Sequence, residues 1–149
     1  MNALPLRLLP GDDLRATLET LARRDFPAGA FLVCGIGSLG DVRLRLAGAD
    51  RATRYAGDHE ILTLSGSITP QGAHLHMSVA SATGEVRGGH LVAGNIVRTT
   101  AELLLVGLPG WRLSRAHDDA TGYPELTTRA AGVPGAPDDG IRPDPRPIA

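Results

Sequence analysis

Residues 73–92 read AHLHMSVASATGEVRGGHLV, and apolar and polar side chains alternate from Ala73 to Ala80. Alternation with a period of two is typical of a β-strand that is buried on one face. Residues 85–92 are expected to return antiparallel to this strand, because Ala82-Thr83-Gly84 suits a three-residue loop whose last glycine takes a positive φ. The stretch therefore predicts a β-hairpin within an antiparallel sheet.

Three histidines fall on this hairpin. In a strand, residues two apart share a face, so His74 and His76 point the same way. With the three-residue loop, His76 lies opposite His90, and His74 lies diagonal to it. Opposite Cβ atoms are about 5 Å apart and diagonal ones about 7 Å apart, which lets three imidazoles reach one ion. A two-residue loop would turn His90 to the other face, and a bulge at Gly88-Gly89 would change the register again.

Three histidines on one face suit Zn²⁺ or another divalent transition metal, with a fourth position left for water or a ligand. The alternative is a polar histidine face at a subunit interface or on the surface, and the residues leave both interpretations open. Glu60 and Glu102 are weaker candidates for a base or for a carboxylate that orients a metal ligand. His59 and the His117-Asp118-Asp119 run are better explained as solvated strand or turn residues than as further ligands.

The segments around the hairpin predict an α+β fold. A helix is expected from residue 12 to about residue 24, with Asp12 as its cap and apolar residues at helical spacing. A second short helix is expected at residues 50–55. The expected strands, besides the hairpin, are residues 4–9 at an edge, 30–34, 42–46, 59–68, 96–106 and 111–115. We predict a mostly antiparallel sheet of about seven strands with one or two flanking helices.

Two local features have a chemical and a structural interpretation. Residues 35–40, GIGSLG, match the G-x-G-x-x-G pattern of dinucleotide-binding loops, but the period-two segment that follows is no helix. A tight turn or bulge between two strands is expected there, and no nucleotide cofactor. Cys34 lies in an apolar run without a neighbouring histidine, so a buried small residue is expected rather than a nucleophile.

Composition narrows the class of protein. The 149 residues suffice for one domain with its own core, and 42% hydrophobic residues are typical of a globular chain. The formal net charge is −1, whereas proteins that bind the DNA backbone usually carry an excess of basic residues. The sequence predicts no membrane span and no secretory signal, and its lone cysteine fits a reducing cytoplasm. Residues 1–126 are expected to form the domain, and the proline- and glycine-rich residues 127–149 a disordered or extended tail.

A set of short stretches occurs in a characteristic order and covers most of residues 4–126. They are PGDDL at 10–14, GIGSL at 35–39, EILTLSG at 60–66, HLHMS at 74–78, GEVRGGHL at 84–91, TTAE at 99–102 and TGYPEL at 121–126. Together they resemble the PPC (plants and prokaryotes conserved) domain in its single-domain bacterial or archaeal form. The resemblance implies an α+β homotrimer, a DNA-binding role, and a metal at the histidines that map to His74, His76 and His90.

Two departures from the plant form bear on function. The tail at 141–147 reads IRPDPRP and lacks the Arg-Gly-Arg core of an AT-hook, and the plant GRFEIL stretch is GDHEIL at 57–62. Three functions follow as hypotheses: a DNA-binding regulatory homotrimer, a metal-dependent ligand-binding protein or enzyme, and a trimeric protein-interaction module. No catalytic residue is identified, and the sequence leaves enzymatic activity open. The apolar residues 103–106 are expected to need burial by a second copy.

Overall fold

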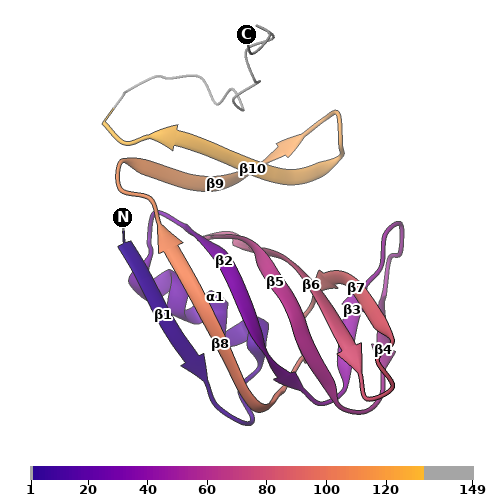
Figure 1. Ribbon diagram of the computed structural model, residues 1–149. Coiled ribbons are helices and arrows are strands. Elements are labelled where there is room, and N and C mark those ends of the chain that lie inside the picture. Colours follow the sequence, from indigo (N-terminus) through magenta and orange to yellow (C-terminus); the bar gives the residue numbers. More distant parts are fainter. Residues whose placement is uncertain (1, 133–149) are drawn as a thin grey trace, which may run out of the picture.

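The computed structural model describes residues 2–132, which form one helix and ten strands (Figure 1). The elements are β1 (Asn2–Leu8), α1 (Leu14–Asp25), β2 (Ala30–Leu39), β3 (Val42–Arg45), β4 (Ala52–Tyr55), β5 (His59–Thr69), β6 (Gly72–Ser81), β7 (Val86–Leu91), β8 (Val97–Gly107), β9 (Trp111–Asp118) and β10 (Tyr123–Ala130). No helix within this range is long and apolar enough to cross a membrane.

Eight strands form one sheet in the order β1-β8-β2-β5-β6-β7-β3-β4, and β9 and β10 form a separate hairpin. Every strand pairing in residues 2–132 is antiparallel, so the predicted α+β class and sheet type are confirmed. In Figure 1, α1 lies behind the sheet and the β9–β10 hairpin stands at one end of it.

One sequence prediction was wrong at the edge of the sheet. Residues 50–55 do not form a second helix, because Ala52–Tyr55 pairs with β3 as the edge strand β4. The predicted domain boundary at residue 126 falls inside β10, which pairs with β9 through Ala130. Residues 133–149 of the predicted tail lie outside the described residues.

The helix begins at a different aspartate from the one predicted. Asp13 is the N-cap and its carboxylate accepts a hydrogen bond from the Ala16 amide at 3.0 Å, whereas Asp12 accepts from the Leu9 amide in the preceding turn. Leu14 and Leu18 are fully buried on the face that α1 turns to the sheet. Burial of this apolar stripe, rather than intrinsic propensity, is what stabilises a helix of three turns.

Apolar side chains of the sheet meet this stripe to form one core. Leu32, Leu64, Leu75 and Leu105 are each at most 1% exposed. Three residues of the 103–106 stretch, expected to require a partner, are also buried within the single chain. That argument for self-association was therefore wrong, although other apolar side chains remain exposed.

The glycine-rich segment at 35–40 is mostly strand. Gly35 to Leu39 belong to β2, whose pairing with β8 shifts register between Leu32 and Cys34 and again between Gly37 and Leu39. The second irregularity confirms a bulge in this segment, although it lies inside β2 rather than between two strands. The strand β3, and not a helix, follows, which removes the dinucleotide interpretation. The first irregularity turns Cys34 outward, so the prediction of a buried thiol was wrong.

Gly66 of β5 permits an unusually close approach of β6. Its φ is +148°, and a Cβ at this position would overlap the carbonyl oxygen of His74. Gly66 is paired with Leu75, so the contact falls between the two histidines of β6. Replacing this glycine therefore disturbs both the sheet and the backbone that carries the histidines.

We predict that Gly66→Ala lowers the free energy of unfolding by about 2–4 kcal/mol, through backbone strain and overpacking together. Gly40→Ala is the matched control, because a Cβ there meets nothing within 4 Å. We expect that control to stay within about 0.5 kcal/mol of the wild type in urea unfolding. Equal stability of the two variants would contradict this account of Gly66.

Candidate metal centre

The turn between β6 and β7 sets the register of the histidines. The Ser81 amide donates to the Glu85 carbonyl at 2.9 Å, and the Gly84 amide donates to the Ser81 carbonyl at 2.9 Å. Gly84 has a φ of +82°, as a three-residue loop ending in a left-handed residue requires. The ladder then pairs His76 with His90, which confirms the predicted register.

The three imidazoles converge on one small volume. Nε2 of His76 lies 3.1 Å from Nε2 of His74 and 3.1 Å from Nδ1 of His90. One ring nitrogen from each of the three histidines lies within 4.8 Å of the others. His74 and His76 are exposed and His90 is half-buried, so an ion or ligand can reach them from solvent.

This donor set fits a metal better than it fits a hydrogen-bonded cluster. A neutral imidazole nitrogen carries either one hydrogen or one lone pair, so Nε2 of His76 cannot serve both neighbours at once. Two Zn–N bonds of about 2.0–2.1 Å at a tetrahedral angle place their nitrogens about 3.3 Å apart, close to the spacing in this structure. Three lone pairs directed at one cation would satisfy all three rings together.

The surroundings keep the imidazoles in the form that binds metal. Burial lowers the pKa of His74 below its usual value, the Arg115 guanidinium lowers it further, and Glu125 acts in the opposite direction. Burial also lowers the pKa of His90, with Arg45 as the next cause. Neutral histidines with free lone pairs are therefore favoured near neutral pH, as metal ligation requires.

The other carboxylates and histidines singled out in the sequence lie elsewhere. Glu60 is five residues along β5 from Ser65, the partner of His76, and Glu102 is on β8, which is separated from β6 by β2 and β5. Neither glutamate lines the pocket beside His74 and His90. His59 is buried and its Nδ1 lies 2.9 Å from the Gly57 carbonyl oxygen, which corrects the expectation of a solvated residue.

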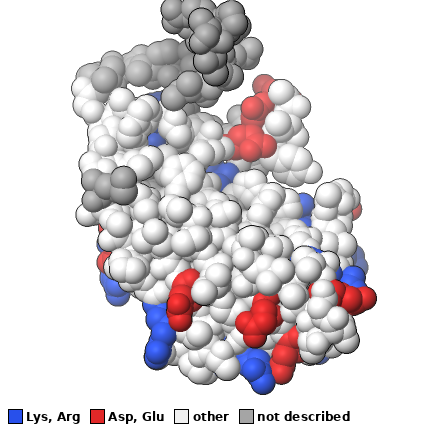
Figure 2. Space-filling model, in the orientation of Figure 1, with Lys and Arg blue, Asp and Glu red and all other residues white. Residues whose placement is uncertain are grey.

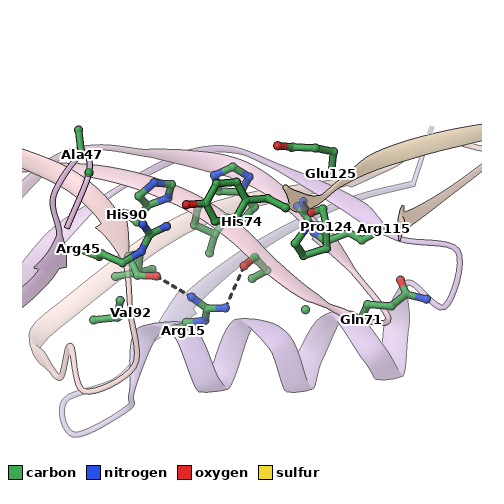
Figure 3. Close-up of a pocket in the computed structure, with 16 residues that line it drawn as sticks. Arg15, Arg45, Ala47, Gln71, His74, His90, Val92, Arg115, Pro124 and Glu125 are labelled. Atoms are coloured by element: carbon green, nitrogen blue, oxygen red, sulfur yellow. Dashed lines mark hydrogen bonds between the residues drawn. The ribbon is translucent and has the colours of Figure 1, made fainter. Parts of the chain in front are cut away.

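His117 lies in β9, is exposed and has Nε2 3.4 Å from Oδ1 of Asp119, as expected of a solvated strand residue. The residues that do surround the cluster are Arg45, Arg115 and Glu125, which sequence reasoning missed (Figure 3). They come from β3 and from the β9–β10 hairpin. No local pattern indicated that these segments meet β6 and β7, so only the pairing of distant strands brings them together.

Comparison with known proteins identifies the family. The model of the Plants and Prokaryotes Conserved (PCC) domain, abbreviated PPC above, matches residues 1–109. The chain belongs to this family. A bifunctional protein GlmU of Synechococcus sp. strain JA-2-3B'a(2-13) is 46% identical over an alignment of 132 residues. The match covers 85% of this chain and 20% of that protein. The chain thus spans about a fifth of the length of the curated relatives that it matches.

Solved structures share the PCC-domain fold. A hypothetical protein of Salmonella enterica is 35% identical with a TM-score of 0.84, covering 87% of this chain and 94% of that one. A metal-containing protein of Archaeoglobus fulgidus is 25% identical with a TM-score of 0.69, covering 84% and 92%. A protein of Ralstonia eutropha JMP134, described as a "putative DNA-binding protein", is 27% identical with a TM-score of 0.70, covering 82% and 88%.

The lowered pKa values of His74 and His90 predict that the metal-free PCC domain is less stable in mild acid. The unfolded histidines take up protons near their ordinary pKa of 6.5, whereas the folded ones resist until a lower pH. The free energy of unfolding therefore falls as the pH drops below about 6.5. Urea unfolding with a chelator at pH 7.5 and pH 5.5 measures this loss.

The control is His74→Gln/His90→Gln, which removes both titrating groups. It should show a smaller loss of stability between the two pH values than the wild type. An unchanged loss in the double variant would assign the pH dependence to other groups.

Proposed function

We propose that this PCC-domain protein binds zinc or another divalent transition metal through His74, His76 and His90. The convergence of three imidazole nitrogens, two of the pairs at 3.1 Å, is the observation that carries the proposal. A metal with three protein ligands keeps a position for water or a ligand, unlike the closed four-ligand sites that only stabilise a fold. A metal-dependent ligand-binding protein or enzyme is the function that this geometry supports best.

The backbone and the neighbouring side chains have different roles at such a site. The hairpin backbone holds the imidazoles in register, and burial beside Arg45 and Arg115 disfavours their protonation. A bound divalent ion would supply Lewis acidity at its open position. The Archaeoglobus relative described as metal-containing supports this assignment at the level of the family.

We predict about one transition-metal ion per chain in tag-free protein, measured by mass spectrometry after incubation with zinc. The His74→Ala/His76→Ala/His90→Ala variant should lose it, because the three ligands are removed together. The matched control is His117→Ala, which removes an exposed histidine outside the cluster and should retain the metal. Wild-type protein without metal, or a triple variant that retains it, would contradict the assignment.

We further propose that the protein is a homotrimer. Val33 and Ile36 of β2 are 52% and 56% exposed, and Leu62 of β5 is 46% exposed. Figure 2 shows that the visible face over the central strands is largely uncharged, with acidic and basic side chains gathered near its lower edge. An uncharged surface with exposed apolar side chains is typical of protein interfaces, and closed symmetric assembly would cover it.

We predict a mass three times the 15.5 kDa of the chain by light scattering. Ile36→Arg should lower that mass, because a charge would be buried in the interface. Ile96→Arg is the control: it places the same charge at an exposed apolar residue outside these strands, and the mass should not change. A folded wild-type monomer at micromolar concentration would rule out the assembly.

DNA binding is the second candidate. It is supported by relatives described as putative DNA-binding proteins, and the formal net charge of −1 gives it no electrostatic support. A mobility-shift assay at low salt decides the matter, since no complex at micromolar protein would eliminate DNA as a partner.

A protein-interaction module is the third candidate, and the match to one fifth of a longer bifunctional protein is compatible with a module joined to other domains. Location in the cytoplasm stays a prediction from the single cysteine.

A further inference from the structure

Two arginines flank the three histidines on opposite sides. Arg45 of β3 is paired directly with His90 of β7, and directly opposed residues share a face with Cβ atoms about 5 Å apart. Arg115 of β9 donates a hydrogen bond from Nη2 to Oγ of Ser67 at 2.7 Å, and Ser67 is paired with His74. The imidazoles therefore lie between two guanidinium groups (Figure 3).

His74, His90 and the two arginines line one pocket of about 600 Å³. This volume falls in the range of small-molecule sites, which are typically about 300–1,000 Å³. The pocket lies where the β9–β10 hairpin meets the sheet, and its wall includes Gln71 and Glu125 besides the histidines and arginines. A ligand here would contact the histidine cluster and both guanidinium groups at once.

The arginines of the pocket differ in how fully their donors are used. Each of the three nitrogens of the Arg15 guanidinium donates to a protein acceptor: it pairs with Glu19 and donates to the carbonyl oxygens of Leu91 and Ala73, as the dashed lines in Figure 3 show for the two carbonyls. Arg115 is held by Ser67 and by the Pro124 carbonyl oxygen, which leaves some of its five N–H groups free. Arg15 and Arg115 thus serve respectively as a structural link and as a positioned donor.

Arg45 has no hydrogen bond or ion pair from its side chain to any of residues 2–132, although it is half-buried. The strand that carries it is held two residues away, because the buried Asn95 side chain accepts from the Arg43 amide at 2.9 Å and donates to the Arg43 carbonyl at 2.9 Å. A half-buried guanidinium beside imidazoles, with no acidic partner among the described residues, favours binding of an anion.

The charges in the pocket set the kind of anion. Arg15 also lines the pocket, but its charge is balanced by Glu19. The other two guanidinium groups against the single carboxylate of Glu125 leave one net positive charge, and a divalent metal would raise this to three. Such a balance suits a small ligand with one or two negative charges. The carboxylate of Glu125 adds an acceptor for a hydroxyl or amine elsewhere on the same ligand.

We propose that this pocket binds a small organic oxyanion, carrying a carboxylate or a phosphate group, between Arg45 and Arg115 and against the metal centre. This inference rests on the proposed metal site, whose open position an oxyanion oxygen would occupy. The planar guanidinium groups match carboxylate and phosphate oxygens with paired hydrogen bonds. Carboxylate and phosphate share this chemistry, and the test below separates them.

The experiment titrates cobalt-loaded protein with succinate and, separately, with inorganic phosphate at constant ionic strength. The visible absorption of Co²⁺ reports a new oxygen ligand, and calorimetry gives the affinity. We expect both probes to bind, with the tighter one identifying the group that the natural ligand carries. Arg45→Gln and Arg115→Gln should each weaken binding about tenfold or more while the bound cobalt is retained.

Arg43→Gln is the matched control, because it removes the same charge two residues along β3 and outside the pocket. Its affinity for the probes should equal that of the wild type. Cobalt binding without any response to either probe at about 10 mM, on the order of ten thousand times the concentration that half-fills a micromolar site, would overturn the oxyanion site. Equal weakening by all three arginine variants would overturn it too, and failure to bind cobalt would instead refute the metal centre itself.

Discussion

The register of the β6–β7 hairpin is the constraint on which the candidate site depends. Because side chains alternate across a sheet, a slip of one residue would send His90 to the face that packs on the core and break up the cluster. The three-residue loop ending at Gly84 fixes the pairing of His76 with His90. The neighbouring β3–β7 ladder places Arg45 opposite His90, so β7 brings the metal-ligand candidates and the flanking charge together.

The charge around the cluster has two opposing effects. Burial and the nearby guanidinium groups keep His74 and His90 unprotonated, which leaves their lone pairs free for a metal. The same positive groups repel a cation, and Glu125 offsets them only in part. An oxyanion in the pocket would compensate the excess, so metal and anion are expected to stabilise each other's binding. This coupling explains why arginines and histidines share a pocket without a larger set of acidic groups.

Local signals in the sequence were enough to predict the β6–β7 hairpin, because its alternating pattern and its loop lie within twenty residues of each other. Local signals also predicted the helix and the long central strands. Local signals failed where distant segments decide the structure: β4 is a strand only because it pairs with β3, and the bulge in β2 exposes Cys34. Arg115 and Glu125 reach the histidines only through the placement of the β9–β10 hairpin, which no short-range pattern encodes.

X-ray absorption spectroscopy at the zinc edge, on zinc-loaded protein, would show whether the three histidines hold a metal. We predict a four-ligand shell with three imidazole nitrogens at about 2.0–2.1 Å and one oxygen, and an outer-shell signal from the rings. That oxygen contribution should change when a bound oxyanion replaces water. A shell of oxygen atoms without imidazole scattering, or one that is the same in the His74→Ala/His76→Ala/His90→Ala variant, would contradict this prediction.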